Sequence, residues 1–196
     1  MQRALTGLIT VALAACGGDP PSRSTPSEAF YRLGSCVDRA DAGCLYRELD
    51  RDSRRSVREM HRSLVEMRRL AERSYPQERR EEALGVWLEA AQAGDPAACF
   101  ALLNERRGWL VRVARGFGAV VEVKYGKGGT AAVLTTRGAE LEMARDGGEW
   151  GLATFEQNLR EDREHLARRL EQVRRNAAAF DEQRAALEPP PGAKGE

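Results

Sequence analysis

Residues 118–154, GAVVEVKYGKGGTAAVLTTRGAELEMARDGGEWGLAT, decide the fold class. Upstream of this stretch apolar residues recur at helical spacing, whereas inside it they are β-branched or alternate with charged residues, as over 121–125. Alternation with a period of two is typical of a half-buried strand. The triplet Asp146-Gly147-Gly148 is a strong hairpin signal. We therefore predict an antiparallel meander of about four strands with one face packed on helices. In the first strand the positions predicted to share one face are Val121, Val123 and Tyr125.

The residues before the meander predict a series of amphipathic helices. Thr25-Pro26-Ser27-Glu28 marks the first start, with Thr25 as cap, Pro26 at the first helical position and Glu28 completing a capping box; Ser27 is the alternative cap. A long helix follows a cap at Asp52 or Ser53, and residues 77–93 predict one further helix. Residues 109–115 fit a helix or a strand equally well.

Residues 156–188 predict one long helix. Its apolar residues recur in steps of three, four or seven and form a heptad-like seam: Leu159, Leu166, Leu170, Val173, Ala177, Phe180 and Leu187. Arg163 and Arg184 interrupt this seam. The pattern fits a helix folded back along its own domain and equally a coiled-coil helix that binds a protein partner. The Pro-rich end, 189–196, is predicted to be a disordered tail.

The whole chain predicts an α+β fold: N-terminal helices packed on a roughly four-stranded antiparallel meander, followed by a long C-terminal helix. We divide it into an α+β domain at 27–155, the heptad-like helix at 156–188 and the tail at 189–196. A length of 196 residues suits one core. With 31 basic and 30 acidic residues, the chain has no net field that would attract nucleic acid.

The N-terminus carries the signals of export. Arg3 precedes an apolar run that is too short to span a membrane and ends in Leu13-Ala14-Ala15-Cys16. This tetrad resembles the lipobox of bacterial lipoproteins; the alternative is a plain secretion signal cut near Ala15. The resemblance implies a signal peptide at 1–15 and acylation of Cys16, for example with palmitate.

Two or more acyl chains anchor a protein stably. We therefore expect attachment to a membrane through the N-terminal lipid, in the bacterial cell envelope. Gly17, rather than Asp, after the lipidated cysteine favours the periplasmic face of the outer membrane over the inner membrane. The segment 16–26 is rich in Gly, Pro and Ser, so we expect a flexible linker there.

Export makes disulfides possible. Cys36 and Cys44 flank a predicted turn between helices, so we predict a disulfide between them; the alternatives are Cys44 with Cys99, or none. The cysteines lack a CxxC spacing and a nearby histidine, so we expect no metal site, and no motif indicates a cofactor.

Two regions resemble a known superfamily. The opening, Thr25 to Phe30 with 39–41 and 45–49, and the closing strand Asp146-Gly147-Gly148-Glu149-Trp150-Gly151-Leu152 are similar to small lipoproteins of the ketosteroid-isomerase-like, or nuclear-transport-factor-two-like, superfamily. Isomerase-type members use a carboxylate base facing a tyrosine or a protonated acid in an apolar pocket. Tyr46 and Tyr125 occupy no matching motif position, so the resemblance implies no catalytic residue here.

No other catalytic pattern emerges. His61 and His165 lie at the borders of apolar helix faces, and no nucleophile motif surrounds any serine. We therefore expect a lipid-anchored envelope protein that acts as a non-enzymatic binding or interaction module. The alternatives are an enzyme of the same superfamily that processes a small molecule, and a structural coiled-coil lipoprotein.

Overall fold

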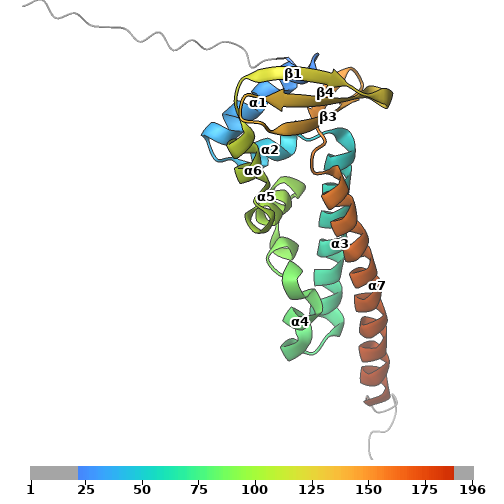
Figure 1. Cartoon of the computed structure of the whole chain (residues 1–196). Helices are drawn as coiled ribbons and strands as arrows, with labels where there is room; N and C mark the ends of the chain where they lie inside the picture. The colour runs from blue at the N-terminus through green and yellow to red at the C-terminus, as the bar shows by residue number, and fades with distance from the viewer. Residues whose placement is uncertain (1–21, 188–196) are drawn as a thin grey trace, which may run out of the picture.

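A computed structural model describes residues 22–187 and confirms the α+β class (Figure 1). Four antiparallel strands form a sheet at one end of the molecule, and two long helices run away from it. The predicted signal peptide, Cys16 and the tail at 189–196 lie outside the described residues. In chain order the elements are α1 (Pro26–Asp38), α2 (Ala42–Glu48), α3 (Arg51–Ser74), η1 (Gln77–Arg79), α4 (Arg80–Leu84), η2 (Gly85–Trp87), η3 (Ala90–Gln92), α5 (Pro96–Arg107), α6 (Trp109–Gly116), β1 (Val120–Tyr125), η4 (Lys127–Gly129), β2 (Thr130–Thr135), β3 (Glu140–Asp146), β4 (Glu149–Leu152) and α7 (Glu156–Leu187).

The helix starts follow the capping chemistry of the sequence, with one shift. At α1, Thr25 accepts a hydrogen bond from the Glu28 backbone N–H and the Glu28 carboxylate accepts one from the Thr25 N–H, so the predicted capping box is confirmed. At α3 the predicted caps were wrong, because Asp50 caps the helix instead. The Asp50 backbone N–H donates to the carbonyl of Leu152 at 3.0 Å, which fixes the helix start beside β4.

Residues 77–93 do not form the single helix that their periodicity predicts. They divide into η1, α4, η2 and η3, with Gly85 at a φ of +55°. The carbonyls of Glu82 and Ala83 accept hydrogen bonds from the guanidinium of Arg169 on α7, at 2.7 and 3.2 Å. In a continuous helix these carbonyls would accept from the backbone four residues ahead. A tertiary contact therefore replaces the helical ladder here. The ambiguous segment 109–115 is helical and lies in α6.

The sheet has the strand order β1-β2-β3-β4, and α1 packs against it. The β3–β4 hairpin turns through Gly147 and Gly148, whose φ values of +58° and +96° suit a tight two-residue turn. The first strand differs from its predicted alternation, since a bulge separates Val120 from Glu122. The bulge leaves Val121 65% exposed. Tyr125 lies beyond the bulge, at the end of the strand, and is 69% exposed, so only Val123 of the three positions is partly buried.

The two outer strands of the sheet differ in what covers them. On β4, the Trp150 N–H donates to the Arg23 carbonyl at 2.8 Å, and Leu152 forms a parallel bridge with Leu49. Among residues 22–187, β1 has a strand partner on one side only, namely β2. The sheet therefore has one covered edge and one edge without a described strand partner.

Helix α7 lies along α3, so the long helix packs on its own domain. Both helices start at the sheet and run in the same direction (Figure 1). The α7 seam is buried from Leu159 to Ala177 and faces the buried α3 row: Val57, Met60, Leu64, Met67 and Ala71. Both arginines that interrupt the seam contact α3, because Arg163 pairs with Glu59 at 3.2 Å and Arg184 donates to the Ser74 carbonyl at 3.0 Å.

Candidate functional site: a cleft beside the terminal helix

The sulfur atoms of Cys36 and Cys44 lie at disulfide distance, with their Cα atoms 5.3 Å apart. The bond joins α1 to α2, and both side chains are buried. Cys99 is a free thiol buried in α5. Burial raises the pKa of Cys99 to about 12, so this thiol is a poor nucleophile at neutral pH.

The structure brings none of the other candidate residues together. Tyr46 packs against Phe100, whereas Tyr125 lies at the edge of the sheet against Trp150. His61 is hydrogen-bonded to the Ala93 carbonyl at 3.1 Å. His165 contacts Trp87 edge-on, with ring centroids 6.5 Å apart.

The packed face of the sheet is filled by side chains rather than hollow. Val133, Met143 and Leu152 on the strands are 1% exposed or less, and Phe30 and Leu33 of α1 are fully buried. Such burial leaves this face without the open apolar pocket that an isomerase-like site requires.

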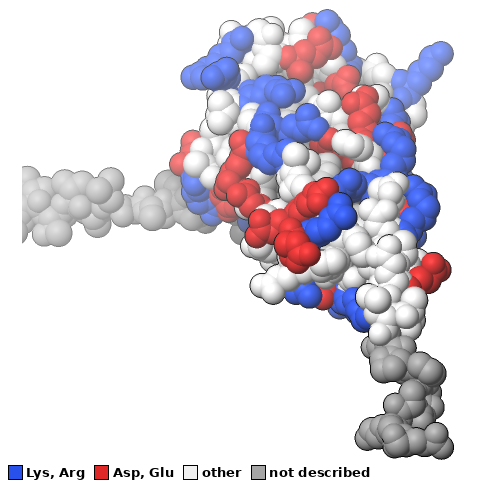
Figure 2. All heavy atoms as spheres, turned by 90° about the horizontal axis from the view of Figure 1, so that it is seen from below, with Lys and Arg blue, Asp and Glu red and all other residues white. Residues whose placement is uncertain are grey.

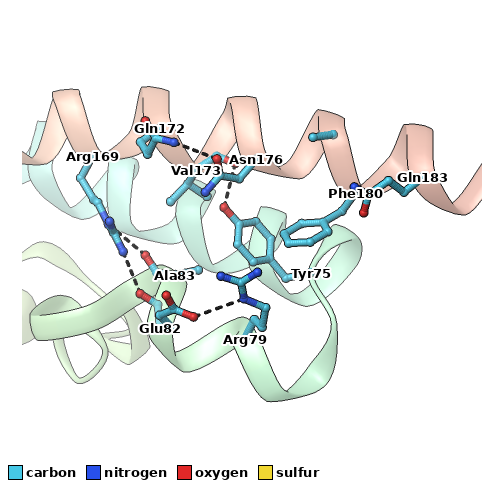
Figure 3. Close-up of a pocket in the computed structure, with 11 residues that line it drawn as sticks. Tyr75, Arg79, Glu82, Ala83, Arg169, Gln172, Val173, Asn176, Phe180 and Gln183 are labelled. Carbon is cyan, nitrogen blue, oxygen red and sulfur yellow. Dashed lines mark hydrogen bonds and ion pairs between the residues drawn. The ribbon is translucent and has the colours of Figure 1, made fainter.

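A cavity that combines aromatic rings with arginine side chains lies elsewhere, where α7 passes the C-terminal end of α3 and the segment η1–α4 (Figure 3). We call it the Tyr75 cleft, and its volume is about 290 Å³. Its lining residues come from the α3–α4 region and from α7: Tyr75, Arg79, Glu82, Ala83, Arg169, Gln172, Val173, Asn176, Ala179, Phe180 and Gln183.

Two aromatic rings form the apolar part of the Tyr75 cleft. The rings of Tyr75 and Phe180 meet edge to face at a centroid distance of 4.9 Å. The Tyr75 hydroxyl donates to the Val173 carbonyl at 3.2 Å, which fixes the ring against α7. Burial raises the pKa of Tyr75, partly countered by a hydrogen bond with Asn176, so the phenol stays neutral at physiological pH.

Two guanidinium groups form the polar part of the cleft. Arg79 lies over the Phe180 ring, 5.8 Å from its centroid, and pairs with Glu82 at 3.3 Å. Arg169 is held by the carbonyls of Glu82 and Ala83, and these two bonds use Nε and Nη2. Arginine has five N–H donors, so donors remain for a ligand. With two arginines and one glutamate, the lining has a formal charge of +1.

Sequence reasoning missed this cleft. Phe180 belongs to the predicted apolar seam, and Tyr75 follows the end of α3 without any motif. Their meeting depends on the offset between α3 and α7, which no local pattern contains. The two arginines carry no distinguishing signal in a chain with 31 basic residues.

Among residues 22–187, neither the charge on the face seen in Figure 2 nor the metal-binding side chains indicate a second site. On the face seen in Figure 2, acidic and basic side chains are interleaved. Within residues 22–187, no cluster of three or more His, Cys, Asp or Glu side chains is arranged to hold a metal ion. In the same range no helix is long and apolar enough to cross a membrane.

Comparison of the chain with protein-family models, with curated proteins and with solved structures gives no match. The assignment of a function therefore depends on the chemistry of the residues described above.

Proposed function

We propose that this chain is a lipid-anchored bacterial envelope protein, held by Cys16, that acts as a binding module and takes its ligand in the Tyr75 cleft. The observation that carries the proposal is the Cys36–Cys44 disulfide. Such bonds persist in the oxidising envelope, and an export signal that ends at Cys16 would send the chain there. The resemblance to superfamily lipoproteins agrees with this location.

Cell fractionation tests the anchor. The wild-type chain is expected in the membrane fraction, and Cys16→Ser is expected in the soluble fraction, because the variant has no acylated sulfur. The matched control is Cys99→Ala, which removes a buried cysteine and should leave the protein in the membrane. Membrane retention of Cys16→Ser would refute the anchor.

The chemistry of the cleft indicates a small amphipathic anion as ligand. The Tyr75 and Phe180 rings offer a surface for an apolar or aromatic body, and the guanidinium groups offer donors for a carboxylate. A volume of about 290 Å³ lies near the lower end of typical small-molecule sites. A carboxylate would also balance the formal +1 charge of the lining.

Calorimetric titration with 4-phenylbutyrate, and with the neutral 4-phenylbutanol as its match, tests this ligand class. We expect 4-phenylbutyrate to bind more tightly than the alcohol. Arg79→Gln should weaken the affinity for 4-phenylbutyrate about tenfold and leave that for the alcohol unchanged, as expected for loss of a charge-assisted hydrogen bond. The control is Arg168→Gln, an exposed α7 arginine outside the lining. Equal affinity for the two compounds would refute an anion site.

The two alternative functions lack comparable support. The superfamily enzyme needs an apolar pocket over the sheet, and that face is filled. The structural coiled-coil lipoprotein needs an outward apolar seam on α7, and α3 covers this seam. A protein partner that binds through α7 would therefore have to contact its charged outer face.

A further inference from the structure

The edge of the sheet at β1 carries exposed apolar side chains and a pair of opposite charges. Val121 and Tyr125 are 65% and 69% exposed. Glu122 and Lys124 lie 3.7 Å apart, and each side chain is more than half exposed. A strand edge without a partner is a template for pairing with another chain.

The backbone N–H and C=O groups of β1 point alternately towards β2 and towards the open edge. The Gly126 N–H donates to the Thr130 carbonyl, and the register with β2 is unbroken from Glu122 to Tyr125. In an antiparallel ladder hydrogen-bonded residues alternate, so Glu122 and Lys124 direct their backbone groups towards β2. Val123 and Tyr125 therefore direct theirs towards the open edge.

The sequence of β1 is complementary to itself about Val123. If two β1 strands pair antiparallel with Val123 opposite Val123, then Glu122 of each copy lies opposite Lys124 of the other. In this register the two copies of Val123 form a hydrogen-bonded pair, because the backbone N–H and C=O groups of Val123 point towards the open edge. Shifting the centre to Tyr125 would place Glu122 opposite Gly128 and lose both charge pairs.

A lone lysine on an edge strand opposes such pairing, and natural proteins use it for that purpose. In β1 Glu122 precedes Lys124 by two residues, so in an antiparallel pair the glutamate of each copy attracts the lysine of the other. The long helices α3 and α7 run away from the sheet, so they do not extend past β1 (Figure 1).

We propose that β1 pairs antiparallel with β1 of a second copy of this chain about a two-fold axis at Val123, which joins two four-stranded sheets into one of eight strands. The occupant of the open edge is thus the same chain, and the interface does not depend on the ligand of the Tyr75 cleft. Tethering of both copies to one membrane would raise their effective concentration and strengthen the pairing.

Cysteine crosslinking of the full chain in the cells that express it tests the register. A hydrogen-bonded antiparallel pair places Cα atoms about 5.5 Å apart, within the range of a disulfide. Val123→Cys is therefore expected to give a covalent dimer on mild oxidation. Val121→Cys is the matched control, because the two copies of residue 121 would lie about 13 Å apart along the strands.

Charge exchange in the Val123→Cys background tests the complementarity. Glu122→Lys alone and Lys124→Glu alone should each lower the dimer yield by about fivefold, because like charges then lie opposite each other. The double exchange, Glu122→Lys with Lys124→Glu, should restore the yield. Absence of a dimer with Val123→Cys, equal crosslinking at Val121→Cys, or single exchanges without effect would overturn the proposal.

Discussion

Truncation of Leu166 to alanine is expected to destabilise the whole domain. This side chain is fully buried where α7 faces α3. A Leu→Ala change in a core costs about 2 to 5 kcal/mol, since apolar contacts are lost and a cavity remains. With a loss of about 3 kcal/mol and an m-value of about 2 kcal/mol/M, the urea midpoint should fall by about 1.5 M.

Equilibrium urea unfolding, followed by tryptophan fluorescence and by far-ultraviolet circular dichroism, measures this shift. Trp109 is a suitable reporter, because it is buried and stacks on Phe155, which directly precedes α7. The two probes should give coincident transitions in the wild type and in Leu166→Ala. The control, Arg168→Ala, removes an exposed side chain of the same helix and should leave the midpoint within about 0.3 M. An unchanged midpoint for Leu166→Ala, or a separate early loss of helical signal, would show that α7 is an independent arm.

Three further outcomes are expected. Removing the disulfide with the double variant Cys36→Ala and Cys44→Ala should lower stability by about 2 to 3 kcal/mol, and reductant should lower the melting temperature of the wild type but not of this variant. Gly151→Ala should destabilise strongly, because its Cβ would lie 2.7 Å from backbone atoms of the segment before α3, whereas Gly94→Ala meets no atom within 4 Å and should be nearly neutral in the same melt. Hydrogen bonds from two serine hydroxyls hold the pKa of Glu28 at about 2, below its usual 4.5, so its contribution to stability should be complete above pH 4.5 and disappear as the pH falls to about 2. Glu28→Gln should flatten the stability profile over that acid range, and an unchanged profile would contradict the assignment.

Local chemistry made much of the fold predictable. The capping box at Thr25, the hairpin at Gly147-Gly148 and the heptad-like seam of α7 are each encoded within a few residues of one another. Features that depend on distant contacts were not predictable. The bond from the Asp50 N–H to the Leu152 carbonyl ties the start of α3 to β4, and Arg169 bonds the carbonyls of Glu82 and Ala83 beside the break at Gly85.

The candidate site shows the same contrast between features set by nearby residues and features set by distant contacts. The pairing of Cys36 with Cys44 is a short-range feature that spacing indicates, and the structure brings their sulfur atoms to bonding distance. The Tyr75 cleft joins residues about a hundred positions apart in the sequence, and it forms because α7 packs along α3. The bulge in β1, which exposes Val121, also had no signal in the alternating pattern.

Attachment to the envelope through Cys16 is the central claim, and the intact mass of the protein extracted from membranes tests it most directly. We predict a chain that begins at Cys16, without residues 1–15, and that carries the added mass of at least two acyl chains on its N-terminal residue. A chain that retains Met1, or one that begins elsewhere and carries no acyl mass, would contradict the claim.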